Sequence, residues 1–182
     1  MKNIVVLCFV FLFFTVTQAF AYKLTDFSSD SKILEAMSIL EQAGETEVFA
    51  NLKKNSVKVR FYNLSAMSAG QRVYAANTYD QYGRRVILIN SIYKTAPVEQ
   101  IACLIAHESC HTARKATLEE ETRATQKEAM CWIKLKNNSV TYPQNKLTKR
   151  LDRLAGLQSS GNNAIQNTIA SSSFYRNQLG LN

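Results

Sequence analysis

The chain has 182 residues and a formal net charge of +8 at pH 7, with 22 Lys and Arg residues against 14 Asp and Glu residues. This length suits one domain once an export signal is subtracted, and the basic surface favours contact with anionic partners such as acidic polymers or membrane faces. No basic motif interleaved with aromatic residues is present, so we expect general anionic contact and no specific nucleic-acid binding.

Residues 1–21 have the pattern of a secretory signal peptide. A positively charged start is followed by an almost wholly apolar run over residues 4–14 and by the small-x-small sequence Ala19-Phe20-Ala21. The apolar run is shorter than the about 20 residues that a membrane span needs. We therefore predict cleavage after Ala21, secretion or delivery to the periplasm, and a single mature domain, residues 22–182, without a transmembrane span.

The next part of the chain predicts two helices and then three strands. Asp30 or Ser31 can cap a helix that Gly44 ends, and a shorter helical piece follows over about residues 46–52. The period then changes, because residues 57–62 alternate apolar and basic side chains as a half-buried strand does. Further strands are expected at residues 73–79 and 85–90, joined into a hairpin by the turn sequence Asp80-Gln81-Tyr82-Gly83. The last strand is expected to be the most buried member of the sheet.

The C-terminal half predicts helices. Pro97 suits the first turn of a helix that continues to about Ala113. Thr117-Leu118-Glu119-Glu120 is a capping box, in which the threonine caps and the last glutamate reaches back, and its helix runs to about Lys136. Peripheral helices are expected at residues 147–157 and, with weaker periodicity, from about residue 164. The predicted fold class is α+β, with a small antiparallel or mixed sheet packed on these two helices.

The first of these helices contains His107-Glu108-Ser109-Cys110-His111, which reads H-E-x-x-H. Residues four apart lie on the same face of a helix, so both imidazoles can reach one metal ion, with Zn²⁺ the usual occupant. Glu108 lies one position round, where it can act as the general base toward a water at the metal. The only two histidines of the protein are both in this motif. The alternative is a helix in which both make ordinary hydrogen bonds.

A catalytic zinc site uses three protein ligands and a water, and the chain offers no third histidine. Three glutamates open the next helix. Glu120 is engaged by the capping box, and Glu119 is placed for solvent and the helix dipole. Glu121 instead shares a face with Glu128 and with the packing residues of that helix. We therefore predict Glu121 as the third ligand, with Glu128 as the alternative.

This arrangement resembles the gluzincin branch of the zincin metallopeptidases, in compact form, over about residues 85–136. That family places H-E-x-x-H on a helix after a mixed sheet whose edge strand lines the cleft. Its third ligand is a glutamate on the following helix, often as E-x-x-A-D. The sequence Glu121-Thr122-Arg123-Ala124-Thr125 matches the glutamate and the alanine. It departs at Thr125, where the family has an aspartate that orients a ligand histidine, and either the Thr125 hydroxyl or Glu128 could take that role.

The resemblance implies a secreted zinc-dependent peptidase that hydrolyses peptide bonds of a peptide or protein substrate, with Glu108 as general base. The implied ligands of its single Zn²⁺ are His107, His111 and Glu121. A tyrosine, an arginine or a backbone group would stabilise the oxyanion, and Tyr142 and Arg123 are the candidate side chains. One alternative is a weak or inactive zincin-like protein of the cell envelope that binds a partner. Another is a basic binding module in which the motif is accidental.

Three cysteines lie outside the predicted signal peptide, which allows one disulfide and one free thiol. Cys103 precedes His107 by one helical turn, and Cys131 lies late in the next helix. These two can meet if the helices are antiparallel, so Cys103–Cys131 is the predicted pair. A Cys110–Cys131 pair and three free thiols are the alternatives.

Overall fold

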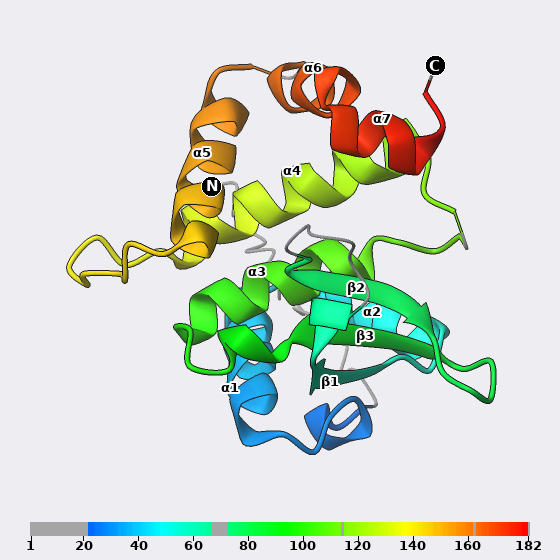
Figure 1. Ribbon diagram of the computed structural model, residues 1–182. Helices are drawn as coiled ribbons and strands as arrows, with labels where there is room; N and C mark the ends of the chain where they lie inside the picture. The colour runs from blue at the N-terminus through cyan, green and yellow to red at the C-terminus, as the bar shows by residue number, and fades with distance from the viewer. Residues whose placement is uncertain (1–21, 67–72, 114, 162, 182) are drawn as a thin grey trace, which may run out of the picture.

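The computed structural model describes residues 22–181 apart from 67–72, 114 and 162 (Figure 1). The predicted signal peptide lies outside the described residues. Within them the chain is α+β, as predicted, with seven α-helices and one three-stranded mixed sheet. None of the helices in this part of the chain has the length and apolar character of a membrane span. Short 3₁₀ turns occur at Leu24–Asp26, Leu64–Ala66 and Ser91–Tyr93.

Two helices precede the sheet, as predicted. Helix α1 (Ser31–Gln42) begins after Asp30, whose side chain accepts hydrogen bonds from the backbone N–H groups of the second and third helical residues at 3.0 and 3.3 Å. Gly44, with φ at +72°, lies just beyond its end in the left-handed conformation that glycine adopts without strain. Helix α2 (Thr46–Lys54) follows and buries one apolar face.

The sheet has the order β1-β3-β2, with β3 (Arg85–Asn90) in the centre. Strand β2 (Ala75–Tyr79) pairs with it antiparallel through the predicted hairpin, whereas β1 (Lys58–Tyr62) pairs with it parallel. The sheet is therefore mixed, which is one of the two predicted arrangements, and the prediction of an antiparallel sheet is wrong. All six residues of β3 are buried, which confirms its predicted place as the innermost strand.

Helix α3 (Val98–Ser109) runs through the middle of the molecule, and every residue from Gln100 to its end is buried. It ends four residues earlier than predicted. The N–H groups of Cys110 and His111 bond to carbonyls three residues back, at 3.0 and 3.3 Å, so the last turn tightens. Asn77 of the edge strand β2 then donates from Nδ2 to the carbonyl oxygens of Glu108 and His111, at 2.8 and 3.2 Å. The Glu108 carbonyl thus accepts a further hydrogen bond, and the His111 carbonyl, which lies beyond the helix end, gains a partner.

Helix α4 (Leu118–Leu135) begins at the predicted cap, where the Thr117 hydroxyl accepts from the N–H of Glu120 at 3.1 Å. Helices α5 (Lys146–Ser159), α6 (Ala164–Ser171) and α7 (Ser173–Leu179) follow and lie on the side of α4 away from the sheet (Figure 1). The weakly periodic C-terminal segment, predicted as one helix, is thus two short helices with a break at Ser172.

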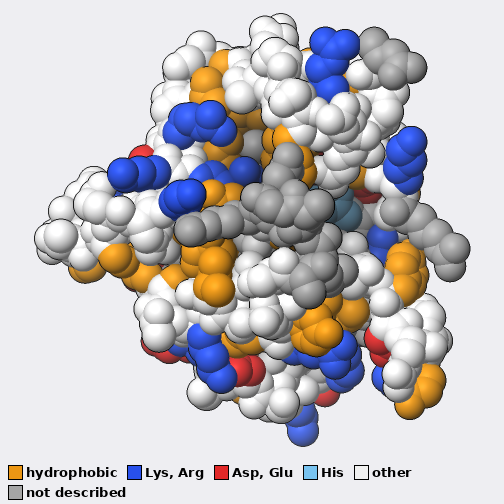
Figure 2. Space-filling model, viewed as in Figure 1, with side chains coloured by type: hydrophobic (Ala, Val, Ile, Leu, Met, Phe, Trp, Pro, Cys, Tyr) orange, Lys and Arg blue, Asp and Glu red, His pale blue; other side chains and the backbone are white. Residues whose placement is uncertain are grey.

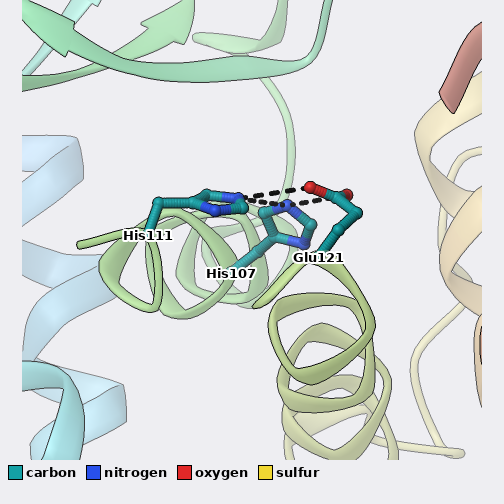
Figure 3. A group of neighbouring side chains, drawn as sticks. All are labelled: His107, His111 and Glu121. Carbon is teal, nitrogen blue, oxygen red and sulfur yellow. Dashed lines mark hydrogen bonds and ion pairs between the residues drawn. The ribbon is translucent and has the colours of Figure 1, made fainter. Parts of the chain in front are cut away.

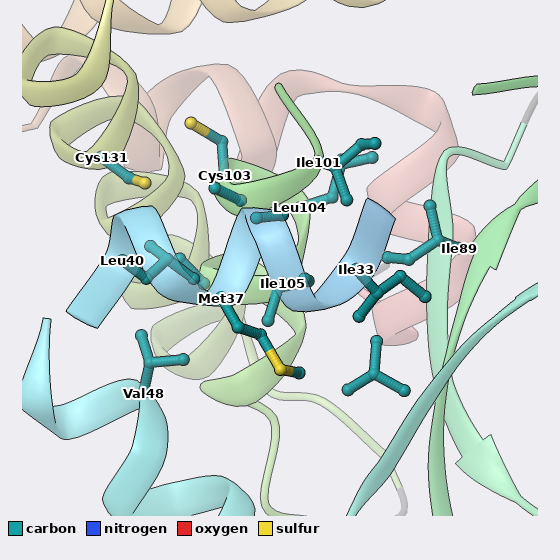
Figure 4. Close-up of a cluster of buried hydrophobic side chains, with 14 of the residues drawn as sticks. Ile33, Met37, Leu40, Val48, Ile89, Ile101, Cys103, Leu104, Ile105 and Cys131 are labelled. Carbon is teal, nitrogen blue, oxygen red and sulfur yellow. The ribbon is translucent and has the colours of Figure 1, made fainter. Parts of the chain in front are cut away.

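The main hydrophobic core lies between α1, α3 and the sheet (Figure 4). Ile33, Met37 and Leu40 of α1 meet Ile101, Leu104 and Ile105 of α3 there, and all six are at most 3 % exposed. A smaller cluster joins α4 and α5 to the C-terminal helices: Ala129, Leu154, Ile165, Ile169 and Leu179. Because α3 is enclosed along its length, the H-E-x-x-H motif at its end is held on a rigid support.

Candidate metal centre

The structure brings His107, His111 and Glu121 together, although they come from two different elements (Figure 3). His107 lies in the last turn of α3, His111 just beyond the end of that helix, and Glu121 in the first turn of α4. One candidate ligand atom from each residue can be chosen so that all lie within 4.8 Å of one another. Although α3 ends before His111, the two imidazoles therefore still lie close enough to bind one ion.

The distances within this group fit a single small cation. The Nε2 atoms of His107 and His111 are 3.2 Å apart, and they lie 3.6 and 3.5 Å from the two carboxylate oxygens of Glu121. Ligands about 2.0–2.1 Å from a tetrahedral zinc ion are separated by roughly 3.3–3.4 Å. Two imidazole nitrogens and a carboxylate oxygen are also the donor types that zinc takes in catalytic sites. The three residues fit the ion in chemistry and in spacing.

The three side chains of this group are largely buried but keep some exposure to solvent. The side chains of Glu121, His107 and His111 are 4 %, 9 % and 13 % exposed. Figure 2 shows histidine surface in pale blue on one face of the molecule. His111 is thus the most exposed of the three side chains, and Glu121 is the most buried.

Behind the group, Glu128 meets the second ring nitrogen of His107. Its Oε2 atom lies 3.0 Å from Nδ1, close enough for an ion pair although outside the angular geometry of a hydrogen bond. Arg150 of α5 donates to both oxygens of the same carboxylate, from Nε at 2.9 Å and from Nη2 at 2.7 Å. Glu128 therefore lies on the far side of the His107 ring from Glu121, so the geometry favours Glu121 as the third candidate ligand.

These contacts set the charges of the group. Burial lowers the pKa of His107, but the Glu128 carboxylate, with smaller contributions from Glu108 and Glu121, outweighs burial and raises that pKa to about 9. Burial, together with the charge on His107, lowers the pKa of His111. Burial raises the pKa of Glu128, but Arg150 and His107 outweigh it and hold the pKa at about 2. Glu128 is thus a permanent anion beside the His107 ring.

Glu108, the predicted general base, is buried next to the ligand group. It is 8 % exposed and lies in the last turn of α3 beside His107. Burial raises the pKa of Glu108 to about 7, which the charge on His107 partly opposes. Its backbone carbonyl is tied to Asn77 of β2 at 2.8 Å, so the edge strand touches the motif directly.

The three glutamates that open α4 have three different environments. Glu119 is exposed, as predicted, and Glu121 is 3 % exposed and faces the histidines. The reciprocal half of the capping box is absent, because Glu120 does not bond back to Thr117. Its carboxylate accepts hydrogen bonds from the backbone N–H and hydroxyl of Thr112 and from the N–H of Ala113. Glu120 thereby anchors the segment that connects His111 to α4.

Both side chains that were predicted as oxyanion donors make other contacts in the structure. Tyr142 is 5 % exposed, packs edge-on against Trp132 with ring centroids 4.9 Å apart, and accepts a hydrogen bond from the N–H of Asn137. Arg123 donates to the carbonyl oxygen of Cys110 at 3.1 Å and so holds the end of α3. The Thr125 hydroxyl, the other candidate support for a histidine, is buried without a hydrogen-bond partner among the described residues.

Cys103, Cys110 and Cys131 are buried and present as free thiols. Cys103 and Cys131 face one another between α3 and α4, as expected for antiparallel neighbours (Figure 4). Burial, followed by a hydrogen bond with Cys131, raises the pKa of the Cys103 thiol well above its ordinary value. Cys103 and Cys131 are therefore neighbours, and a disulfide between them stays a prediction.

Sequence reasoning missed two residues that contact the site. Arg150 lies in a segment that the sequence predicts only as a peripheral helix, and Asn77 carried no signal within its strand. Both act across long sequence separations, 22 residues to Glu128 and 31 to Glu108. The clue for Arg150 was its place among the apolar residues Leu147, Leu151 and Leu154, which share the buried face of α5.

Comparison with known proteins leaves the site to be judged on its own geometry. No protein-family model, curated protein or solved structure matches the chain.

Proposed function

We propose that the protein is a compact zincin-like metallopeptidase that binds one zinc ion through His107, His111 and Glu121. The observation that carries the proposal is the convergence of two imidazole nitrogens and a carboxylate at separations of 3.2 to 3.6 Å. Export through the predicted signal peptide, residues 1–21, belongs to the same proposal and would place the enzyme outside the cytoplasm.

Each residue has a role that follows from its place. A zinc ion at this group would supply Lewis acidity, lowering the pKa of a water to about 7 and polarising a substrate carbonyl. Glu108, one residue from a ligand and in the same turn, would accept the proton of the attacking water and pass it to the leaving amine. Glu128 and Asn77 would keep His107 and the end of α3 in place.

A second candidate is a zincin-like protein that binds metal or a partner without turnover. The observation that favours it is the engagement of Tyr142 and Arg123 in packing and in capping α3. A hydrolase would then need its oxyanion donor from backbone or from another side chain.

Turnover by the wild-type protein and by Glu108→Gln separates these functions. Zinc-loaded protein is incubated with a mixed peptide library, and new termini are identified by mass spectrometry. We expect cleavage by the wild type, and loss of cleavage in Glu108→Gln with an unchanged zinc content, because the amide cannot accept the proton but leaves all three ligands in place.

Glu119→Gln is the matched control, since it removes an exposed carboxylate near the site. It should cleave like the wild type. Cleavage retained by Glu108→Gln would exclude the general-base role, and a zinc-loaded wild type without activity on any peptide would favour the binding protein.

A further inference from the structure

Arg150 is a half-buried cation in α5, outside the region that resembles the zincins. Its side chain is 17 % exposed, and its guanidinium makes a two-point hydrogen bond to a carboxylate that is fully buried, that of Glu128. A planar guanidinium that bonds both oxygens of a carboxylate sets its position and its plane. Arg150 therefore determines how the Glu128 carboxylate stands in the interior.

The guanidinium is itself held from two other sides. Its central carbon lies 5.2 Å from the ring centroid of Tyr74, just before β2, and Tyr74 stacks on Tyr93 with centroids 5.5 Å apart. Burial lowers the pKa of this guanidinium, but Glu128 and, after it, Tyr175 in α7 raise that pKa well above its ordinary value, so Tyr175 lies nearby. The Arg150 side chain is thus bounded by Tyr74, by Glu128 of α4 and by the C-terminal helix.

We infer that Arg150 is a positioning residue of the metal centre, acting through Glu128 on His107. Glu128 lies 3.0 Å from Nδ1 of His107, and Nε2 of the same ring faces Glu121 at 3.6 Å. A carboxylate held on one ring nitrogen orients the ring, so that its other nitrogen points at the metal position. The chain Arg150–Glu128–His107 therefore extends the site into α5. This inference rests on the proposed metal site.

In the family that the sequence resembles, an aspartate at a fixed position orients a ligand histidine. In this protein the Glu128 carboxylate, held by its contact with Arg150, takes that role. Thr125 occupies that position and bonds to nothing among the described residues. Glu128 is one helical turn further along α4 and needs a partner to hold it, because an unpaired buried carboxylate is unfavourable. Arg150 is that partner, which explains why a cation lies on the inward side of an otherwise amphipathic helix.

The test measures zinc affinity by competition with a chromophoric chelator in four variants: Arg150→Gln, Arg150→Lys, Glu128→Gln and the Arg150→Gln/Glu128→Gln double variant. Arg150→Gln should weaken zinc binding by about 10- to 100-fold, the usual effect of losing such a support. Lysine keeps the charge but offers a single point of contact, so Arg150→Lys should recover part of the loss. The double variant should bind no more weakly than Glu128→Gln alone, because Arg150 acts through Glu128.

Arg153→Gln is the control, since it removes an exposed cation from the same helix. Circular dichroism of each zinc-free variant shows whether the fold is kept, and if Arg150→Gln does not fold, Arg150→Lys carries the comparison. Arg150 variants that bind zinc as tightly as Arg153→Gln would overturn the inference, as would losses that simply add in the double variant. A wild type that binds no zinc would instead overturn the proposed function.

Discussion

Three successive glutamates at the start of α4 have the same side chain but three different roles, because each points in a different direction from the helix axis. Glu119 points to solvent, Glu120 anchors the Thr112 segment, and Glu121 faces the two histidines at 3.5 and 3.6 Å. Each side chain is turned by about 100° from its predecessor around the helix axis. Only the third therefore shares the buried face of α4.

The metal affinities of Glu121→Ala and Glu119→Ala should differ strongly. Loss of one of three ligands should weaken zinc binding by well over the about 10- to 100-fold expected for a supporting residue, whereas Glu119→Ala should leave it unchanged. Zinc competition against a chelator measures both. Equal affinities in the two variants would contradict the assignment of Glu121 as a ligand.

Much of the site could be predicted at the residue scale because it depends on local periodicity. The shared face of Glu121 and Glu128 needs only the geometry of a helix, and the spacing of the two histidines still brings their imidazoles together although His111 lies just beyond the end of α3. The supporting role of Glu128 was one of two options left open for the missing aspartate. Choosing it required the position of Arg150 in space, which no local pattern contains.

At the scale of elements, α4 is the helix that connects the site with the rest of the molecule. It contacts α3, α5 and α6, and its outer face reaches back to α2. There Glu45 lies 2.7 Å from the Nζ of Lys127 and 3.1 Å from that of Lys134. These ion pairs join the N-terminal helices to the helix that holds Glu121.

Glu45→Gln should destabilise the protein in a pH-dependent manner. Burial raises the pKa of Glu45, but Lys127 and Lys134 outweigh it and lower the pKa below the unfolded value. The pairing therefore stabilises above the unfolded pKa of about 4.3 and is lost as pH falls through the folded pKa. We expect a loss of about 1 kcal/mol in the free energy of unfolding at pH 7.

Urea unfolding at pH 7 and in acid measures this difference. Glu47→Gln is the control, because that carboxylate is 57 % exposed and 3.4 Å from the same Lys127, and its effect should be smaller. A loss in Glu45→Gln that does not shrink in acid would refute the ion-pair explanation.

The neighbouring thiols of α3 and α4 lead to a prediction that applies if the protein is exported as proposed. Cys103 and Cys131 face each other in the core, and a disulfide there would join the helices that carry His107 and Glu121, two of the proposed metal ligands. Because burial and the raised pKa of Cys103 slow its oxidation in the folded state, the bond should form during folding. Mass spectrometry of a non-reduced digest should find a Cys103–Cys131 peptide; a Cys110–Cys131 peptide, or none containing Cys131, would count against it.

The periodicity of the sequence predicted where the helices and strands lie, but not how all of them pair with and contact one another. The change from helical to alternating spacing located both N-terminal helices and the three strands to within two residues or so. Alternation assigns faces and is silent on strand direction. The hairpin fixed β2 against β3, whereas β1 and β3 are not consecutive strands, so no local turn signal indicates their parallel pairing. The early end of α3 likewise depends on Asn77, a contact from another element.

At the scale of the whole molecule, the candidate site lies where the sheet and the helices meet. The edge strand contributes Asn77, α3 and its end contribute the histidines, α4 contributes Glu121, and α5 contributes Arg150. A bound ion would therefore add a further link between elements that already meet through packing, hydrogen bonds and ion pairs. Any ligand that binds the folded state alone stabilises it, so zinc should raise the unfolding temperature of the wild type.

The zinc content of the purified protein tests the central claim most directly. Wild type and His111→Ala are purified without chelators, loaded with excess Zn²⁺, dialysed and measured by elemental analysis. We predict close to one zinc per wild-type chain and a large loss in His111→Ala, which removes one of three ligands. A wild-type protein that stays free of metal after loading, or a His111→Ala variant that retains as much zinc as the wild type, would contradict a metal centre at His107, His111 and Glu121.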